Sequence, residues 1–133
     1  MAEAMPKAHI VTLNQPKPAE FERAVKHLAL YRNVSLLQVC SWDYLEALEP
    51  GMLFDLVFVD GDHVQIGRDL PWWEHIAPGG LFLFHDYSPE KSGRPCVPVY
   101  EGINRWMVEK DLEPDVLVVD DRQVGMIGFY NGR

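Results

Sequence analysis

Residues Phe54–Tyr87, FDLVFVDGDHVQIGRDLPWWEHIAPGGLFLFHDY, carry the strongest structural pattern in this chain of 133 residues. Two continuous apolar runs, Leu56–Val59 and Leu81–Phe84, indicate neighbouring buried strands. Strands that are apolar on both faces are typical of a parallel sheet covered by helices, and parallel strands need a crossover connection between them. Val64–Ala77 has the length of such a crossover helix. The stretch therefore predicts an α/β fold.

Ionisable side chains stand where each of these two runs ends. Asp60, Asp62 and His63 follow the first run, and His85 and Asp86 follow the second. In open α/β sheets, ligands bind outside the carboxyl ends of the strands, so these side chains fall where chemistry is expected. Asp62 stands just before the predicted crossover helix, and we expect it to cap the amino end of that helix.

The residues before Phe54 continue the alternation of strands and helices. The β-branched run His9–Leu13 predicts a strand. Pro18 can open a helix whose apolar residues follow the i, i+3, i+4, i+7 spacing, and we expect this helix to end near Arg32. Val34–Cys40 predicts a second strand, and Trp42–Leu48 a short helical turn after it.

The residues after the crossover predict a turn, a long loop, a helix and a closing hairpin. Pro78–Gly80 indicates a turn that no regular element can run through. Ser88–Pro98 holds three prolines and predicts a loop long enough to cover a site. Val99–Lys110 has apolar residues at helical spacing. Val116–Val119 and Val124–Phe129 predict a terminal antiparallel hairpin.

Composition limits the classes of partner and location. Twelve basic residues against twenty acidic ones give a net charge of −8, which argues against nucleic acid and anionic membranes as partners. No apolar run approaches the roughly 20 residues that span a bilayer, and the first residues lack a signal peptide's apolar core. We therefore expect a soluble cytoplasmic protein, one domain over 1–133, with Cys40 and Cys96 as free thiols.

The order of elements and three short motifs resemble a known family. VDGDH, followed by PGG and HDY, is similar to the small-molecule O-methyltransferases among the class I S-adenosylmethionine-dependent methyltransferases. The resemblance covers roughly Ala8–Tyr130, from that family's second strand onward. It implies a Rossmann-like, mostly parallel sheet flanked by helices, with a C-terminal antiparallel hairpin. It also implies S-adenosylmethionine as the cofactor, with Asp43 contacting the adenine amino group.

The chain departs from the family where the cofactor is held. The family's first strand and glycine-rich loop, which let the backbone approach the methionine end of the cofactor, have no counterpart, since only MAEAMPK precedes the second-strand match. The family places an Asp or Glu at the end of its second strand to bind the ribose hydroxyls, and Asn14 stands there instead. An amide bonds to a hydroxyl without charge-assisted strength. We therefore expect a truncated fold that binds its cofactor weakly or not at all.

The resemblance also implies roles for the residues at the strand ends. In the metal-dependent members of the family, three side chains at these positions hold a magnesium ion, and here they are Asp60, His85 and Asp86. Mg²⁺ prefers oxygen ligands, so His85 shifts the preference toward Mn²⁺, Fe²⁺ or Zn²⁺. His63 lies near the position of the family's general base, and an imidazole can take a hydroxyl proton near neutral pH. The alternative is that these residues bond only to loop backbone and to one another.

Three functions from different classes follow from these observations. The first is a methyltransferase whose cofactor loop comes from another chain or an upstream segment. The second is a methyltransferase-derived module that binds a small ligand or assembles without catalysis. The third is a metal-dependent hydrolase built on Asp60, His63, His85 and Asp86.

The missing first strand predicts self-association. In the family it separates the second and fourth strands, so its absence leaves two edges whose unpaired backbone groups need partners. Either His9–Leu13 pairs directly with Asp55–Val59, or a second copy contributes across the gap. We expect a contracted sheet within a homo-oligomer, most simply a twofold dimer with apolar residues such as Trp72, Trp73 or Trp106 at its interface.

Overall fold

The computed structural model describes residues 7–14, 18–89, 96–119 and 125–132. The chain divides into two compact units, residues 1–48 and residues 49–133, and each is described by itself. All the fully buried hydrophobic side chains among the described residues lie in the second unit. The single domain expected over 1–133 stays a prediction.

The first unit is a small βαβ motif followed by a helical turn. Strand β1 (Ile10–Asn14) pairs in parallel with β2 (Val34–Gln38), and helix α1 (Pro18–Leu28) connects them. Helix α2 (Ser41–Glu46) follows β2. These elements confirm the predicted order, although α1 ends before Arg32. The predicted pairing of His9–Leu13 with Asp55–Val59 would join the two units, so it stays a prediction.

The second unit contains a four-stranded sheet in the order β3-β4-β6-β5. Strand β3 (Phe54–Val59) and β4 (Ile76–His85) are parallel, as their apolar runs predict. Strand β6 (Met126–Tyr130) is antiparallel to both β4 and β5 (Val116–Val118). Three of the four strands therefore run in one direction, and the predicted closing hairpin is confirmed. Its connecting residues 120–124 lie outside the described residues.

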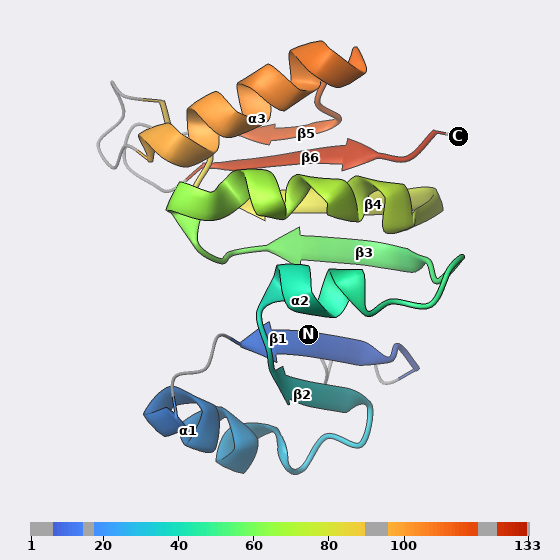
Figure 1. The fold of residues 1–133 in the computed structure, drawn as a ribbon, viewed down its shortest axis with the longest axis vertical. Coiled ribbons are helices and arrows are strands. Elements are labelled where there is room, and N and C mark those ends of the chain that lie inside the picture. Colours follow the sequence, from blue (N-terminus) through green and yellow to red (C-terminus); the bar gives the residue numbers. More distant parts are fainter. Residues whose placement is uncertain (1–6, 15–17, 90–95, 120–124, 133) are drawn as a thin grey trace. The chain divides into compact units, whose positions relative to one another are not determined.

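One face of this sheet holds the core. The rings of Phe82, Phe84 and Phe129 are completely buried. They lie against Trp73 from the segment before β4 and Trp106 from helix α3 (Val97–Lys110), with ring centroids 5.2–6.3 Å apart. Figure 1 shows both segments on the same side of the sheet. Burying each such ring contributes roughly 1.5–3 kcal/mol, so this aromatic layer dominates the stability of the unit.

The opposite face of the sheet is apolar and partly open to solvent. Leu56 stands beside Leu81, and Phe58 stands beside Leu83, in the β3–β4 register. Leu56 is 38% exposed and Phe58 42% exposed. Their neighbours in sequence, Val57 and Val59, point toward the aromatic layer through their register partners Phe82 and Phe84. The helical segments of the second unit therefore cover one face of a sheet whose sequence is apolar on both.

The predicted crossover helix over Val64–Ala77 is wrong in type. Two 3₁₀ helices, η1 (His63–Arg68) and η2 (Leu70–His75), take its place. Their backbone bonds span three residues, from Asp69 N–H to Ile66 O and from Trp72 N–H to Asp69 O. Pro71 has no N–H for a bond four residues back, and its ring would collide with the carbonyl of Gly67 in an α-helix. Tighter bonds of the 3₁₀ type avoid both conflicts.

The predicted turn Pro78–Gly80 falls inside a strand that begins earlier than expected, at Ile76. Phe54 pairs with Ile76 but Leu56 pairs with Leu81, so the extra residues of β4 form a bulge. Gly79 has a φ of +78°, which a glycine adopts without strain. Asn131 holds the bulge, because its backbone N–H donates to Gly80 O and its side chain donates to Ile76 O.

Other boundaries differ slightly from the predictions. Strand β2 ends at Gln38 rather than Cys40, and α3 begins at Val97 rather than Val99. Pro98 occupies the first turn of α3, where a missing N–H costs nothing. The predicted covering loop falls largely on residues 90–95, outside the described residues.

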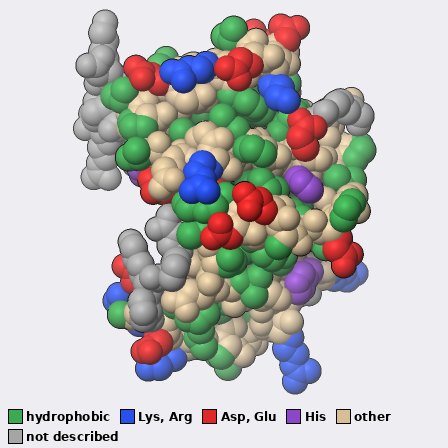
Figure 2. All heavy atoms as spheres, in the orientation of Figure 1, with side chains coloured by type: hydrophobic (Ala, Val, Ile, Leu, Met, Phe, Trp, Pro, Cys, Tyr) green, Lys and Arg blue, Asp and Glu red, His purple; other side chains and the backbone are tan. Residues whose placement is uncertain are grey.

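The surface of the described residues carries both signs of charge. On the face that Figure 2 shows, basic side chains are scattered among acidic and apolar ones. No helix within the described ranges is long and apolar enough to cross a membrane. The cytoplasmic location stays a prediction.

Candidate functional site

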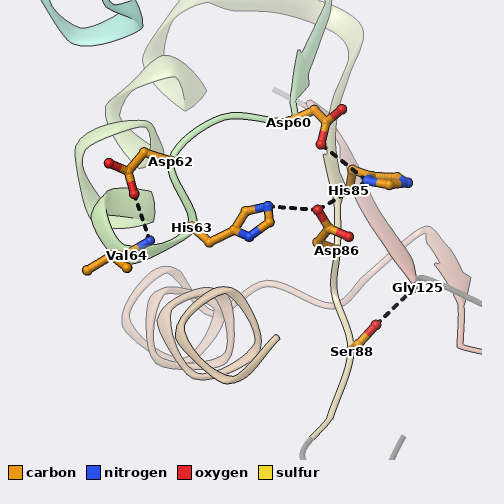
Figure 3. A network of polar contacts seen from close by, with 8 residues as sticks. All are labelled: Asp60, Asp62, His63, Val64, His85, Asp86, Ser88 and Gly125. Carbon is orange, nitrogen blue, oxygen red and sulfur yellow. Dashed lines mark hydrogen bonds and ion pairs between the residues drawn. The ribbon is translucent and has the colours of Figure 1, made fainter. Parts of the chain in front are cut away.

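The candidate site lies at the carboxyl ends of β3 and β4. Val59 pairs with Phe84 as the last partners of the two parallel strands, so the next residues, Asp60 and His85, stand side by side. Figure 3 shows their side chains turned toward each other, with Asp86 and His63 close by. The prediction that these residues converge is therefore confirmed by the strand register.

His63 reaches the site from the start of η1. Asp62 is the N-cap of this 3₁₀ helix, and its carboxylate accepts a hydrogen bond of 3.0 Å from the Val64 N–H. The predicted capping role of Asp62 is thus confirmed, although the helix is not an α-helix. The cap fixes the backbone at the point where the His63 ring leaves the chain toward Asp86, as Figure 3 shows.

The shortest contact in the site joins His63 to Asp86. His63 Nε2 lies 2.7 Å from Asp86 Oδ2, a length typical of a charge-assisted hydrogen bond. The Asp86 side chain is 18% exposed and that of His63 is 42% exposed. The carboxylate is thus mostly shielded while part of the imidazole ring faces solvent. This arrangement leaves His63 Nδ1 as the nitrogen that can exchange a proton with another molecule.

His85 occupies an unusual position between two carboxylates. Its Nδ1 lies 3.2 Å from Asp60 Oδ1 and 3.3 Å from Asp86 Oδ2. This nitrogen is buried, and no described group forms a hydrogen bond with it. Buried polar atoms are normally satisfied, so a cation among these groups would complete the arrangement.

Asp86 is held in a strained backbone conformation. Its φ is +60°, in the left-handed region that residues with side chains seldom adopt. The segment after it is anchored, since Ser88 Oγ accepts a hydrogen bond from the Gly125 N–H and the Tyr87 N–H donates to Gly125 O. Strain held by surrounding structure is often found at functional sites. Here it turns the Asp86 carboxylate toward His63.

One set of described side chains has the spacing of a metal site. Ligand atoms of Asp60, His63 and Asp86 all lie within 4.8 Å of one another. The set predicted from the sequence has His85 in place of His63, and His85 Nδ1 lies 3.2 Å from an oxygen of Asp60 and 3.3 Å from an oxygen of Asp86. Both imidazoles therefore border the same carboxylate pair.

Two further side chains near the site have raised pKa values. Burial raises the pKa of the Tyr87 hydroxyl, with a further contribution from Tyr100, although its hydrogen bond to Asn104 opposes the shift. Burial also raises the pKa of the Cys96 thiol, and the nearby Asp86 charge adds to the effect. Both groups therefore stay neutral near pH 7. Cys96 has no activated thiolate, which agrees with an unreactive free thiol.

The predicted cofactor residues belong to the first unit. Asn14 is the last residue of β1 and pairs with Gln38, the last residue of β2. Asp43 is exposed in the first turn of α2, directly after β2. Each thus lies at a carboxyl strand end of its own unit. Their contacts with a cofactor stay predictions.

Sequence reasoning missed one residue that anchors the site, Ser88, and one buried acidic residue of the crossover, Asp69. Ser88 was assigned to a loop, and nothing in the sequence links it to Gly125, 37 residues away. Asp69 is 2% exposed between the two 3₁₀ helices, and no helical pattern predicts an acidic residue there as buried. The only available signal was the pair of Gly67 and Pro71 on either side of it, which marks a break in the crossover.

Comparisons with known proteins agree on a family. A sequence model described as a methyltransferase domain matches residues 1–87, which is 87 of the 133 residues. No curated protein matches the sequence at a significant level.

Solved structures share the fold at low sequence identity. The O-methyltransferase TomG from Streptomyces achromogenes, solved with S-adenosylmethionine, has a TM-score of 0.73 at 20% identity over 98% of this chain and 66% of its own. The methyltransferase PaMTH1 from Podospora anserina, bound to S-adenosylhomocysteine, gives 0.67 at 20% identity, with coverage of 92% and 60%. An O-methyltransferase from Bacillus cereus gives 0.64 at 17%, with coverage of 90% and 61%. The chain thus spans less than two thirds of the length of each.

Proposed function

Because this chain belongs to the methyltransferase-domain family, we propose that it is an O-methyltransferase-type domain in which His63 takes the proton of a substrate hydroxyl. The observation that carries the proposal is the 2.7 Å contact between His63 Nε2 and Asp86 Oδ2. The carboxylate favours the tautomer with hydrogen on Nε2, which leaves the lone pair of Nδ1 to accept a proton. Asp86 then stabilises the imidazolium that forms. S-adenosylmethionine supplies the methyl group when it is bound.

The substrate class follows from the chemistry of this base. A neutral imidazole removes protons from hydroxyls most readily when the resulting oxyanion is stabilised. A small molecule with an acidic hydroxyl, such as a phenol or catechol, fits this requirement. The partly exposed His63 ring leaves the proton-accepting atom accessible from solvent. The two neighbours named as O-methyltransferases support methylation at oxygen.

A divalent ion is the second part of the proposal. Asp60, His63 and Asp86 fit such an ion by their 4.8 Å spacing, and the buried Nδ1 of His85 lies beside the same carboxylates without a hydrogen bond. Two carboxylates and an imidazole suit Mn²⁺, Fe²⁺ or Zn²⁺ better than Mg²⁺. A bound ion would stabilise the substrate oxyanion. An ion bound through His63 Nε2 would replace the contact of that atom with Asp86, whereas an ion bound through His85 would leave the contact in place.

We also propose that the isolated chain binds its cofactor weakly. Asn14 offers the ribose hydroxyls an amide where a carboxylate would bond more strongly, and the exposed Asp43 is the one acidic group of α2's first turn. Calorimetric titration with S-adenosylmethionine tests this directly. Weak or absent heat is expected, and saturable binding at micromolar concentration would contradict it.

Methyl transfer to a panel of phenols and catechols, at the highest workable cofactor concentration, tests the base. His63→Gln is expected to lower the rate by about 10²–10⁴-fold. His75→Gln is the matched control, because the His75 ring bonds to Met52 O outside the site. Equal rates for the two variants would refute the role of His63. No transfer by the wild-type chain would favour the non-catalytic ligand-binding alternative.

Separate titrations with Mn²⁺ and Zn²⁺ distinguish the ligand sets. A native-state ligand must raise the thermal midpoint. If His63 is a ligand, His63→Gln should abolish the rise, whereas His85→Gln should abolish it if the set predicted from the sequence is correct. An unchanged midpoint with both ions would remove the metal site from the proposal.

A further inference from the structure

Helix α3 contacts both segments that carry the His63–Asp86 pair. It lies on the same side of the sheet as η1, the 3₁₀ helix that begins with His63 (Figure 1). The two helices pack against each other. Tyr87, the residue that follows Asp86, contacts α3 as well. One helix therefore touches the supports of both members of the pair.

The contact between α3 and η1 is close at Gly102. A Cβ atom at this position would lie 2.7 Å from Cγ2 of Ile66, whereas carbon atoms in favourable contact are about 3.5–4.0 Å apart. Ile66 stands three residues after His63 and is buried. Because its Cγ2 is attached directly to Cβ, this methyl group can move only if χ1 rotates or the η1 backbone shifts. Glycine at position 102 thus sets how closely η1 approaches α3.

The contact between α3 and the Asp86 segment is made by Tyr87. Its hydroxyl donates a hydrogen bond of 2.8 Å to Asn104 Oδ1. The centroid of its ring lies 4.8 Å from that of Tyr100, which stands one helical turn before Asn104. Tyr87 directly follows the left-handed φ of Asp86, so these contacts hold the backbone that turns the Asp86 carboxylate toward His63.

The two contacts lie on opposite flanks of α3. Successive residues of an α-helix are turned by about 100°, so Gly102 and Asn104 point in directions about 200° apart. Ile103 stands between them in sequence and is completely buried. A regular helix fixed by its buried face therefore holds η1 on one flank and Tyr87 on the other.

We propose that α3 sets the distance between His63 Nε2 and Asp86 Oδ2, with Gly102 and Asn104 as positioning residues. Gly102 controls the place of η1, and Asn104 controls the place of the segment after Asp86. For its kinetic consequence the inference rests on the proposed function, in which His63 is the base. A misplacement of about 1 Å by a change away from the reacting atoms can lower a rate on the order of 10²-fold.

Crystal structures of Asn104 variants test the geometry without any need for activity. Asn104→Leu removes the acceptor of the Tyr87 hydroxyl at similar volume, whereas Asn104→Asp keeps an acceptor oxygen. The distance from His63 Nε2 to Asp86 Oδ2 should exceed about 3.2 Å in the leucine variant and stay near 2.7 Å in the aspartate variant. Tyr87→Phe breaks the same hydrogen bond and replaces Asn104→Leu if that variant does not fold. An unchanged distance in the variant that lacks the bond would remove Asn104 from the inference.

The same measurement on Gly102→Ala tests the other flank. Alanine favours a helix over glycine, so a change in this variant reports the collision with Ile66 rather than loss of α3. The distance from His63 Nε2 to Asp86 Oδ2 should again exceed about 3.2 Å. Gly67→Ala is the matched control, since no described atom lies within 4 Å of a Cβ at that position of η1, and it should leave the distance unchanged. Unchanged distances in both Gly102→Ala and the Asn104 variant would overturn the inference.

Methyl transfer to a phenol measures the kinetic consequence. Asn104→Leu and Gly102→Ala should lower kcat by about 10-fold to 10²-fold with little change in the KM of the phenol, and Asn104→Asp should restore most of the rate. Combined with His63→Gln, either change should cause no further loss, because both act through His63. A further loss in the double variant would overturn this positioning role in favour of a general effect on the fold. If His63→Gln alone is as fast as the wild-type chain, the proposed function fails, and the distance measurement still decides the inference.

Discussion

Replacement of Asp86 separates backbone strain from side-chain chemistry. The left-handed conformation of an L-residue costs about 1–2 kcal/mol, and glycine avoids this cost but loses about 0.5–1 kcal/mol through its freer unfolded chain. The contact with His63, which is 42% exposed, contributes at most about 1 kcal/mol because solvent screens it. Asp86→Ala loses the contact and keeps the strain of φ +60°, so we expect destabilisation of up to about 1 kcal/mol. Asp86→Gly loses the contact and relieves the strain, so we expect stability within about 0.5 kcal/mol of the original.

Urea unfolding followed by tryptophan fluorescence measures this difference. Three of the four tryptophans, Trp72, Trp73 and Trp106, are buried in the same unit as Asp86, so the signal reports on that unit. A gap of about 1 kcal/mol between the alanine and glycine variants corresponds to a few degrees in thermal midpoint. Both variants should lose base-assisted methyl transfer equally, because both lack the carboxylate. Equal stability of the two variants would refute the strain argument.

Three other substitutions test the frame around the site. Asp111 ends α3 with a φ of +53°, so Asp111→Gly should raise the free energy of unfolding by about 0.5–1 kcal/mol, which the urea midpoint measures. A methyl group at Gly125 would overlap the Tyr87 carbonyl, so Gly125→Ala should lower the midpoint, while Gly67→Ala, with open space around it, should not. The raised pKa of Tyr87 stabilises the fold below its unfolded value of 10.0, and this contribution is lost as pH rises above it. Tyr87→Phe should flatten the fall in stability above pH 10 and cost about 0.5–1.5 kcal/mol at neutral pH, by removing the hydrogen bond to the part-buried Asn104 side chain.

Much of the fold could be predicted from hydrophobic runs and turn residues. The runs ending at Val59 and Phe84 are adjacent parallel strands, and the closing hairpin is antiparallel, as predicted. The same runs also predict cover on both faces of the sheet, yet Leu56 and Phe58 are partly exposed. An apolar run indicates that both faces of a strand are covered in the folded protein. It does not indicate which segment, or which chain, covers each face.

The candidate site was predicted in composition but not in pairing. Asp60, His85 and Asp86 were predicted to lie close together because they follow the ends of two neighbouring parallel strands. The register of the two strands confirms that placement. The specific contact of His63 with Asp86 depends on the positive φ of Asp86, and a sequence pattern does not encode that angle at an aspartate. The anchoring bond between Ser88 and Gly125 joins residues 37 positions apart, which local reasoning cannot reach.

The site depends on two points where regular structure stops, and these have different consequences for mutation. His63 begins a 3₁₀ helix that is fixed by the carboxylate of Asp62, so the backbone there does not depend on the imidazole. Asp86 follows the end of β4 in a strained conformation, so its side-chain contact and its backbone strain both contribute to the free energy of unfolding. Removing the imidazole should therefore change chemistry at a cost to stability of at most about 1 kcal/mol, the value of its contact with Asp86, whereas the cost of replacing Asp86 also depends on the backbone preference of the new residue. An activity loss in His63→Gln at unchanged urea midpoint would then be attributable to proton transfer rather than to the fold.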